Sequence, residues 1–475
     1  MNLGRAAMLV TLSLALAGCM AVDRFSSPLA APVPASVAPV EPSVGSVQQI
    51  RPESDLAGEA LARLDRRIAH YPQDYEAMLL KGLVYYESRQ YEKALAALDE
   101  LARRAPGFQL AQMIRGDMLL SRVEPVTGIG HTPLLHAMPD SRYILVEDLR
   151  DEARARLQAY LQSRNGHELP GELLRLGESV GAAILVDKRV NRLYLFGNTG
   201  AGSPPELLYD FYVSTGRARG DKRVRGDLRT PEGVYFVTRY TPDSRLPEKY
   251  GVAAFPINYP NELDRYLRKT GGGIWLHGIT HRFYSRPPLD SEGCVVLSNT
   301  DLEQIIPLIE PKVTPVVIAE RLEWLEPGVW SGRRKEIMRA LRRWQHDWES
   351  GDAVRYLANY APDFWADGYD FRSWSAHQRQ VLAGGNGVRV TLSDISLLSY
   401  PHRADSGREI AVADFLLEYR SGDSVESHRK RLYFSKNLDR WYVLHESDLP
   451  QDGTTLAGSA ETPAERRLRT GPAGG

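Results

Sequence analysis

The sequence predicts a multidomain α+β protein, and three features of the chain support that fold class. The 475 residues are too many for one hydrophobic core. The period of apolar residues changes from helical to strand-like near Gly181, and a second pattern of helix followed by strands begins near residue 332. The predicted order is therefore a helical N-terminal region, a predominantly β segment and a C-terminal α+β domain.

The N-terminus predicts export and a lipid anchor. Residues 1–18 carry Arg5 and then a short apolar run, as a signal peptide does. The run ends in Leu-Ala-Gly-Cys at Cys19, which resembles a bacterial lipoprotein processing site and implies cleavage before Cys19 and acylation of its thiol. No Asp follows Cys19, which favours the outer membrane and a periplasmic location. The alternative is an ordinary signal peptide with a chance cysteine.

Two further segments are predicted to be disordered. Residues 19–50 are rich in Pro, Ala, Val and Ser without apolar periodicity, which is typical of a tether. Residues 451–475 form the second segment, a C-terminal tail. Charges are balanced over the chain, with 59 Lys and Arg against 60 Asp and Glu, so the composition does not indicate a nucleic-acid partner.

Residues 51–165 have the pattern of a helical region. Pro72 and Pro106 lie 34 residues apart, which is the period of the tetratricopeptide repeats that this region resembles. The resemblance implies a groove for a protein partner, and a plain helical hairpin domain is the alternative. We expect residues 122–145 to be a loop, followed by a charged helix.

Residues 178–322 predict a mostly β domain. Runs rich in β-branched and aromatic residues alternate with polar turns, which favours strands. The predicted strands are 182–196, 207–216, 232–240, 271–278 and 314–320, and residues 294–298 are expected to lead into a helix at 299–309.

Residues 330–450 begin with a helix and end with strands. Ile337, Leu341, Trp344 and Trp348 share one helical stripe, and the Arg-rich remainder of the helix is interpreted as a solvated face. The helix and the strands after it resemble the SnoaL-like, cone-shaped α+β domains, which implies ligand binding or dimerisation without deciding between them. Three long strands are predicted, at 388–400, 408–421 and 428–446.

One thiol in the β segment suggests chemistry. If Cys19 is acylated, Cys294 has no partner for a disulfide, although exported proteins usually pair their thiols. His277 precedes Cys294 by seventeen positions, at the end of a predicted strand. A nearby imidazole can take the proton of a thiol and form a nucleophilic ion pair. The pattern predicts a cysteine acyltransferase or hydrolase, and a buried inert cysteine is the alternative.

Small residues flank both predicted catalytic side chains. The carbonyl of Gly278 is expected to orient the ring of His277. Gly293 lets the backbone approach a substrate closely, so that its amide and that of Cys294 can face a developing oxyanion. Ser291 is expected to hold this turn by side-chain hydrogen bonds.

Four motifs resemble the L,D-transpeptidase (YkuD-type) family. "IWLHG" followed by "SEGCVVLSNTDL" is similar to its active-site signature, and "VSTG" and "TPEGVYF" match two further landmarks. The resemblance implies that Cys294 is the nucleophile, His277 the general base and the Gly278 carbonyl the ring-orienting group. It also implies an oxyanion hole at Gly293 and Cys294. No metal or organic cofactor is implied.

The chain departs from the family pattern at two positions. Glu292 stands where His is common, and Val296 stands where many members have an Arg that helps to position the substrate. We expect Arg282 or Arg286, in the loop between the two motifs, to take over that task. His281 is a rival base, but it lacks the setting at a strand end.

The family implies peptidoglycan stem peptides as substrate. Cys294 would attack the carbonyl at the L-centre of the third stem residue and release D-Ala from a tetrapeptide. An amine acceptor makes the protein an L,D-transpeptidase, which we favour. Water as acceptor makes it an L,D-carboxypeptidase, and the upstream "KYG" and "FPINYPNELDR" resemble cell-shape carboxypeptidases with a SnoaL-like domain.

Two other classes are alternatives. A non-catalytic periplasmic adaptor would use the helical and C-terminal regions to bind partners, and a sortase-like ligase would need a catalytic Arg in a different context. For an enzyme we expect a thiol probe at pH 7 to label Cys294 faster than a free cysteine. For an adaptor we expect slow labelling.

Overall fold

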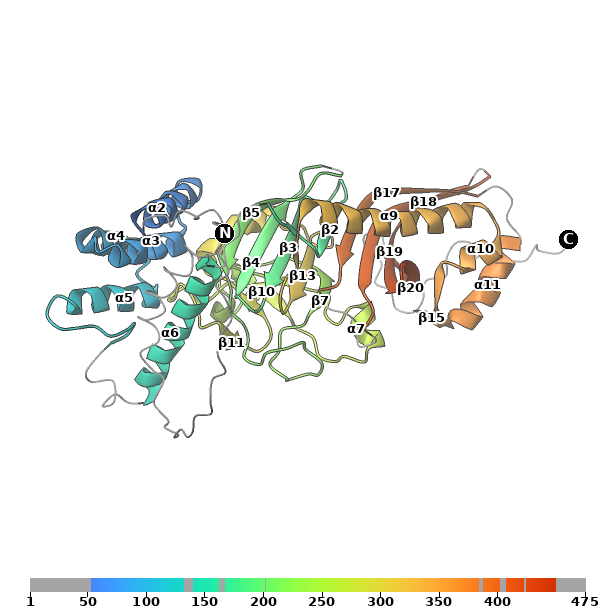
Figure 1. Ribbon diagram of the computed structural model, residues 1–475. Coiled ribbons are helices and arrows are strands. Elements are labelled where there is room, and N and C mark those ends of the chain that lie inside the picture. The colour runs from blue at the N-terminus through green and yellow to red at the C-terminus, as the bar shows by residue number, and fades with distance from the viewer. Residues whose placement is uncertain are drawn as a thin grey trace, which may run out of the picture. The chain divides into compact units, whose positions relative to one another are not determined.

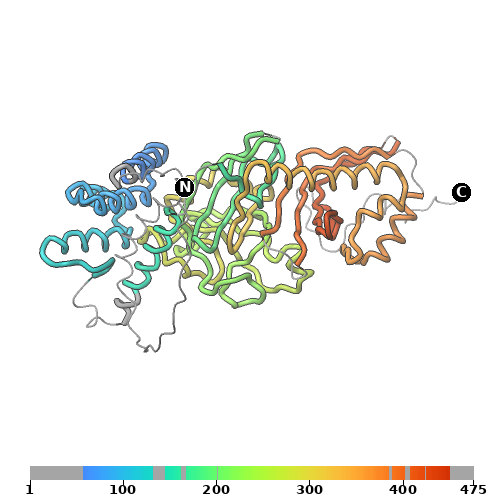
Figure 2. The backbone as a smooth tube through the Cα atoms, viewed as in Figure 1, coloured from blue at the N-terminus to red at the C-terminus, as the bar shows by residue number. Residues whose placement is uncertain are grey.

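The computed structural model describes residues 53–131, 140–161, 167–200, 202–383, 388–401, 407–422 and 424–449. The predictions for the signal peptide, for Cys19, for the tether and for the C-terminal tail concern residues outside those ranges. The described chain forms two compact units, drawn in Figures 1 and 2. One unit contains residues up to 157 with residues 282–284, and the other contains residues 158–281 and those from 285 onward.

The first unit is helical, as predicted. Gly82 lets two helices approach closely, because an added Cβ would lie 3.1 Å from the side chain of Leu98. Tyr284 also packs in this unit, with its ring centroid 4.4 Å from that of Phe108. That the helices form a tetratricopeptide repeat stays a prediction. The helices are α2 (Glu53–His70), α3 (Tyr75–Glu87), α4 (Tyr91–Arg104), α5 (Gln109–Leu120) and α6 (Asp140–Leu161).

The loop predicted at residues 122–145 is wrong at its C-terminal end. Helix α6 begins at Asp140 and includes the last six residues of that range. Asp and Ser favour the first positions of a helix because their side chains can accept hydrogen bonds from its unpaired amides. The pair Asp140-Ser141 is therefore a plausible helix start that the prediction passed over.

The second unit starts with a five-stranded sheet in the order β5-β4-β3-β13-β7. Strands β3 and β13 run parallel and the other pairs are antiparallel. Every residue of β3 and β13 is buried, which explains their nearly continuous apolar runs. The strands are β3 (Ala182–Asp187), β4 (Arg192–Gly197), β5 (Glu206–Tyr212), β7 (Gly233–Phe236) and β13 (Pro315–Ala319).

A four-stranded sheet in the order β12-β10-β9-β8 carries His277 and the residues directly after Cys294, and the two-stranded pair β11-β6 carries Ser291. The predicted β character of this segment is confirmed. Short strands within polar stretches were missed, because two or three residues show no period. The strands are β6 (Thr215–Gly216), β8 (Thr241–Pro242), β9 (Ala253–Pro256), β10 (Trp275–His277), β11 (Leu289–Ser291) and β12 (Val295–Val296). Helices α7 (Glu262–Tyr266) and α8 (Asn299–Ile305) follow β9 and β12.

The C-terminal part combines helices with a seven-stranded sheet in the order β16-β15-β20-β19-β18-β17-β2. Helix α9 (Pro327–Glu349) runs along this sheet (Figure 1), and its Ile337, Leu341 and Trp344 are buried as predicted. The other helices are α10 (Ala353–Leu357) and α11 (Phe371–Ala383). The strands are β2 (Leu173–Arg175), β15 (Tyr360–Ala366), β16 (Tyr369–Asp370), β17 (Val388–Ser399), β18 (Ile410–Ser421), β19 (Ser424–Asn437) and β20 (Arg440–Leu449).

The third long strand predicted for this part is wrong, since residues 428–446 belong to two antiparallel strands. A tight turn separates β19 from β20, and Leu438 adopts a φ of 52° there. Turns of this kind require left-handed backbone and usually contain Gly, Asn or Asp. Leucine at the turn hid it from the sequence pattern.

Two connections join the motif-bearing segment to the C-terminal sheet. Strand β2 pairs with β17, and β1 (Leu169–Pro170) pairs with β14 (Trp324–Leu325). Around α7, Asn261 donates to the Tyr400 hydroxyl at 2.6 Å, and the Tyr433 hydroxyl donates to Glu262 at 2.7 Å. Among the helices of the described ranges, none is both long and apolar enough to cross a bilayer.

Candidate active site

Strand pairing brings the two predicted catalytic residues to neighbouring positions. Strands β10 and β12 are parallel, with Leu276 opposite Val295 and His277 opposite Val296. His277 is thus the last residue of β10, and Cys294 immediately precedes β12. The sixteen residues between them, 278–293, leave the sheet and return to it beside β10, and they include the short strand β11.

The imidazole of His277 is held in one orientation. Its Nδ1 lies 2.6 Å from the carbonyl oxygen of Gly278, so Nδ1 carries the proton and donates it to that oxygen. The Tyr250 ring packs edge-on against the imidazole, at a centroid distance of 4.9 Å, and tilts against Trp275 at 4.8 Å. The remaining nitrogen, Nε2, is the proton acceptor of the ring.

Burial keeps both groups neutral at rest. Desolvation lowers the pKa of His277 to about 4, partly opposed by the Gly278 hydrogen bond. Desolvation also raises the pKa of Cys294, while a backbone hydrogen bond from Trp275 and the charge of Arg286 lower it. The ion pair expected from the sequence is therefore not the resting state. Both the imidazole and the thiol are neutral at neutral pH, so attack by the sulfur requires that the thiol lose its proton in the reaction.

Ser291 organises the turn that carries the nucleophile. Its hydroxyl donates to the Cys294 carbonyl at 2.6 Å and accepts the amide N–H of Gly293 at 3.1 Å. Gly293 has a φ of 127°, and an added Cβ would lie 2.6 Å from the carbonyl oxygen of Arg229. Only glycine fits this conformation and this gap.

The proposed oxyanion hole therefore differs from the expectation. The amide of Gly293 is engaged by Ser291 rather than facing a substrate. The amide of Cys294 has no hydrogen-bond partner within the described ranges. One of the two predicted donors is thus available in this conformation.

Asn299 is a positioning residue that the sequence prediction missed. Its side-chain oxygen accepts the amide of Ile279 at 3.0 Å, and its amide donates back to the Ile279 carbonyl at 2.7 Å. An added Cβ on Gly278 would collide with the same oxygen, at 2.2 Å. Asn299 thereby fixes the backbone directly after His277. The only sequence signal was a polar residue at the start of a predicted helix.

A buried charge network supports the backbone opposite the thiol. The sulfur of Cys294 donates to the Gly273 carbonyl at 3.6 Å. The loop before Gly273 is held by Lys269, whose ammonium lies 2.9 Å from Asp264 and 2.7 Å from Asp221. The "GDKRVRGD" loop thus packs beside the candidate site instead of standing free in solvent.

The two arginines predicted to bind substrate lie in different units. Arg286 is in the same unit as the Cys294–His277 pair, donates to Asp290 at 2.8 Å, and affects the pKa of both groups. Arg282 belongs to the helical unit. Lys249, which the sequence prediction did not single out, acts on both pKa values in the same direction as Arg286.

The rival base and the two positions that depart from the family pattern have different surroundings. His281, the rival base, pairs with Asp243 at 3.5 Å. Val296 is buried in β12, bonded through its backbone to Ser214, so this position supplies no cation to the site. Glu292 is exposed and raises the pKa of Cys294 through its charge. The described residues contain no cluster of His, Cys, Asp or Glu arranged to hold a metal ion.

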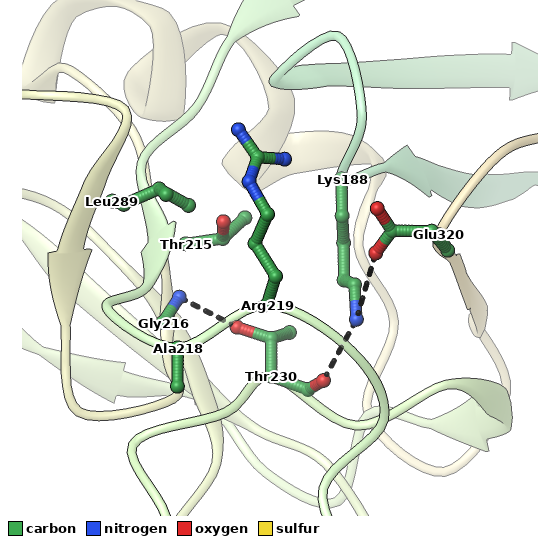
Figure 3. Close-up of a pocket in the computed structure, with 8 residues that line it drawn as sticks. All are labelled: Lys188, Thr215, Gly216, Ala218, Arg219, Thr230, Leu289 and Glu320. Carbon is green, nitrogen blue, oxygen red and sulfur yellow. Dashed lines mark hydrogen bonds and ion pairs between the residues drawn. The ribbon is translucent and has the colours of Figure 1, made fainter.

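A small hollow lies beside the β6–β11 pair, with about 200 Å³ of open space (Figure 3). Lys188 points toward Glu320 and the Thr230 carbonyl, and the Gly216 amide donates to the Thr230 hydroxyl at 2.8 Å. Neither Cys294 nor His277 lines this hollow. The hollow is lined by Leu289 of β11, the strand that contains Ser291, and it is separate from the candidate active site at Cys294.

Taken together, the geometry suits acyl transfer at a thiol. A ring nitrogen that accepts protons, a half-buried sulfur and an unpaired amide lie within one short turn and one strand end. A carbonyl carbon placed at the sulfur would have a base on one side and an amide for its oxygen.

Comparison with known proteins agrees with both predicted domains. Residues 181–318 match the L,D-transpeptidase catalytic domain, YkuD. Residues 336–447 match the Cds6 C-terminal NTF2-like domain, the fold type predicted as SnoaL-like. The predicted resemblance is confirmed. None of the proteins of curated function is similar enough to count as a match.

Two solved structures are similar to this chain. Bd1075 of Bdellovibrio bacteriovorus is 28% identical, with a TM-score of 0.53 over 60% of this chain and 100% of its own. The helical cell shape determining protein Pgp2 of Campylobacter jejuni is 24% identical, with a TM-score of 0.49 over 58% of this chain and 95% of its own.

Proposed function

We propose that the protein transfers acyl groups of peptidoglycan stem peptides through a thioester on Cys294, because residues 181–318 match the L,D-transpeptidase (YkuD) catalytic domain. The observation that carries the proposal is the parallel pairing of β10, which ends at His277, with β12, which begins directly after Cys294. The hydrogen bond from Nδ1 to Gly278 then leaves Nε2 to receive the thiol proton.

In the first half-reaction, Nε2 of His277 takes the proton of the thiol while the sulfur attacks the carbonyl carbon of the scissile amide. The carbonyl electrons move to oxygen, and the Cys294 amide donates a hydrogen bond to that oxyanion. When the tetrahedral adduct collapses, the C–N bond breaks and the imidazolium returns the proton to the leaving amine. D-Ala departs and a thioester remains. One such amide donor contributes about 10²- to 10³-fold to the rate.

In the second half-reaction, an acceptor attacks the thioester and His277 takes its proton. The sulfur leaves as thiolate and recovers the proton from the imidazolium. An amine acceptor forms a new amide, which is the L,D-transpeptidase reaction that we favour. Water forms a tripeptide, which is the L,D-carboxypeptidase reaction.

One observation favours the second candidate function, the L,D-carboxypeptidase reaction, in which water is the acceptor. Glu292 is adjacent to the glycine before the nucleophile, and its carboxylate is exposed. A carboxylate at that position can hold a water molecule by hydrogen bonding near the thioester. It also discourages anionic acceptors by charge repulsion.

The test is incubation with purified tetrapeptide muropeptides, followed by mass spectrometry. Wild type, Cys294→Ala and, as a matched control, His281→Gln should be compared. Released D-Ala with dimers joined between third residues marks the transpeptidase, and tripeptide without dimers marks the carboxypeptidase. Both products should vanish in Cys294→Ala and persist in His281→Gln. Unchanged substrate with wild type would overturn the proposal and leave the adaptor hypothesis.

We also propose that acylation of Cys19 anchors the protein to the outer membrane, facing the periplasm. The support is the Leu-Ala-Gly-Cys sequence after the apolar run. Metabolic labelling with a fatty acid and membrane fractionation test this proposal. Cys19→Ser should lose the label and leave the membrane fraction, whereas Cys294→Ala should keep both. A labelled Cys19→Ser protein would contradict it.

A further inference from the structure

Several arginine side chains in the second unit are neutralised by carboxylates. The half-buried or buried guanidinium groups of these pairs lie 2.5–2.7 Å from an acidic oxygen, which offsets the cost of removing them from water. Such pairs are Arg192–Asp210, Arg333–Glu323, Arg408–Asp363, Arg429–Asp414 and Arg431–Asp414.

Three arginines where α9 crosses β2 have no such partner among the described residues, and we call Arg175, Arg334 and Arg342 the arginine cluster. The Trp330 indole donates to the Leu173 carbonyl at 3.0 Å, which fixes the start of α9 over β2. Arg175 ends β2, and Arg334 lies one helical turn after Trp330. Arg342 follows Arg334 by eight residues, so both project from the same side of α9.

The cluster contains no ion pair with a carboxylate among the residues that the structure describes. Arg334 donates to the Gly202 carbonyl at 2.5 Å and stacks on Trp330, and Arg342 donates to the amide oxygen of Gln345 at 2.8 Å. The Nε atom of Arg175 is buried and has no acceptor. An unsatisfied buried donor on a charged group is costly unless a ligand completes it.

The three charges act on one another. The pKa of Arg175 is lowered, first by burial and then by the charges of Arg334 and Arg342. Glu178 and Asp394 oppose this shift, but Asp394 already accepts hydrogen bonds from Ser179 and Arg429. The pKa of Arg175 stays lowered despite these two acidic groups, and an anion beside the three arginines would relieve their mutual repulsion.

We propose that the arginine cluster binds a phosphate-type oxyanion, at a site separate from Cys294 and independent of the acyl-transfer proposal. Guanidinium groups present paired N–H donors that match the oxygens of a phosphate. Arg342 is exposed and Arg175 and Arg334 are half-buried, so a ligand can approach from solvent while the buried Nε of Arg175 marks the inner end. The phosphate can be a free ion or the headgroup of a phospholipid.

The test compares Arg334→Gln/Arg342→Gln with Arg339→Gln/Arg372→Gln, which removes two exposed arginines outside the cluster. Each double variant is made in the full chain carrying Cys19→Ser, so that acylation cannot anchor it. Titration calorimetry with inorganic phosphate forms one arm. Sedimentation with phosphatidylglycerol–phosphatidylcholine vesicles, against phosphatidylcholine alone, forms the other.

We expect the cluster variant to bind phosphate or the anionic vesicles at least tenfold more weakly than the control variant, which should match the parent. Binding of the free ion alone identifies a soluble ligand, and binding of the vesicles alone identifies a headgroup. The parent's thermal unfolding temperature should rise with phosphate, whereas that of the cluster variant should not, which separates lost binding from lost folding. No binding by the parent in either arm, or equal losses in both variants, would overturn the proposal.

Discussion

At the scale of single residues, the candidate site combines a strained turn with a desolvated acid–base pair. His277 has one nitrogen committed to Gly278, and Ser291 holds both the carbonyl of Cys294 and the amide of Gly293. Burial opposes charge on both the imidazole and the thiol. The thiol therefore reacts when a substrate carbonyl is in place, because the sulfur can then attack the carbonyl carbon while His277 takes the thiol proton.

Slow alkylation of Cys294 is the first consequence. Because burial raises the thiol pKa above its ordinary value of 9.0, iodoacetamide at pH 7 should react more slowly with Cys294 than with a free cysteine. The rate should keep rising with pH beyond 9. Arg286→Gln should slow it further, since the guanidinium lowers the pKa of that thiol. Cys294→Ala gives the background.

This expectation reverses the labelling test suggested by the sequence alone. An enzyme of this kind would show slow labelling at rest, so slow labelling does not indicate an adaptor. Labelling faster than free cysteine at pH 7 would mean that the resting pair is ionised.

Removal of the Ser291 hydroxyl should affect turnover more than substrate binding. Ser291→Ala deletes two hydrogen bonds, each worth about 1 kcal/mol, and loosens the turn before Cys294. We expect kcat for D-Ala release to fall about tenfold with KM little changed. Ser350→Ala, which deletes a comparable bond to the Asp347 carbonyl at the end of α9, should leave kcat unchanged. Equal kcat in both variants would show that the turn holds without Ser291.

At the scale of elements, helix α7 links the C-terminal sheet to the backbone beside the thiol. Asn261 and Glu262 bond to Tyr400 and Tyr433 of that part, and Tyr266 stacks on Trp365 at a centroid distance of 4.8 Å. Lys269, just after α7, bonds to Asp264 and Asp221. The chain then reaches Gly273, whose carbonyl accepts the Cys294 thiol.

Loss of one α7 bond should lower stability measurably. Tyr433→Phe removes the hydroxyl that donates to the largely buried Glu262 at 2.7 Å. Loss of this hydrogen bond should lower the unfolding free energy by about 1–3 kcal/mol. Urea denaturation measures it. Tyr240→Phe is the control, because the side chain of Tyr240 is 44% exposed, and its change should stay below about 0.5 kcal/mol. Similar values for the two variants would contradict a role of this bond in fastening α7.

At the scale of the whole molecule, the second unit is joined by strands from outside its two matched domains. Residues 169–175 pair first with β14 and then with β17. Glu172 lies between these two strands, buried, with one oxygen accepting the Glu323 amide at 2.8 Å and the other without a partner. Desolvation raises the pKa of Glu172 from 4.5 to about 8.

This carboxyl should make the second unit less stable as the pH rises. The folded state holds the Glu172 proton more tightly than the unfolded state, so its contribution is fully present below pH 4.5 and is lost between that value and about 8. Glu172→Gln should match wild type in unfolding free energy near pH 4.5 and exceed it by more than about 1 kcal/mol at pH 9. Glu178→Gln is the exposed control. A pH-independent difference would contradict the shift.

The amino-acid sequence alone was enough to predict much of this architecture, because apolar period and turn residues are local signals. The long strands, the buried stripe of α9 and the motif around Cys294 belong to this class. Strand β11, the turn at Leu438 and the start of α6 escaped because they have few residues or atypical ones.

What only the tertiary structure decided depends on residues distant in sequence. The neutral resting state of Cys294 and His277 follows from desolvation by surrounding segments, and residue types do not reveal burial. Packing likewise decides three further features. The Gly293 amide donates to Ser291, Asn299 holds the backbone after His277, and Arg282 and Arg286 lie in different units. The sequence thus determined which groups could react, and the fold determined their protonation and partners, because both depend on what excludes water around them.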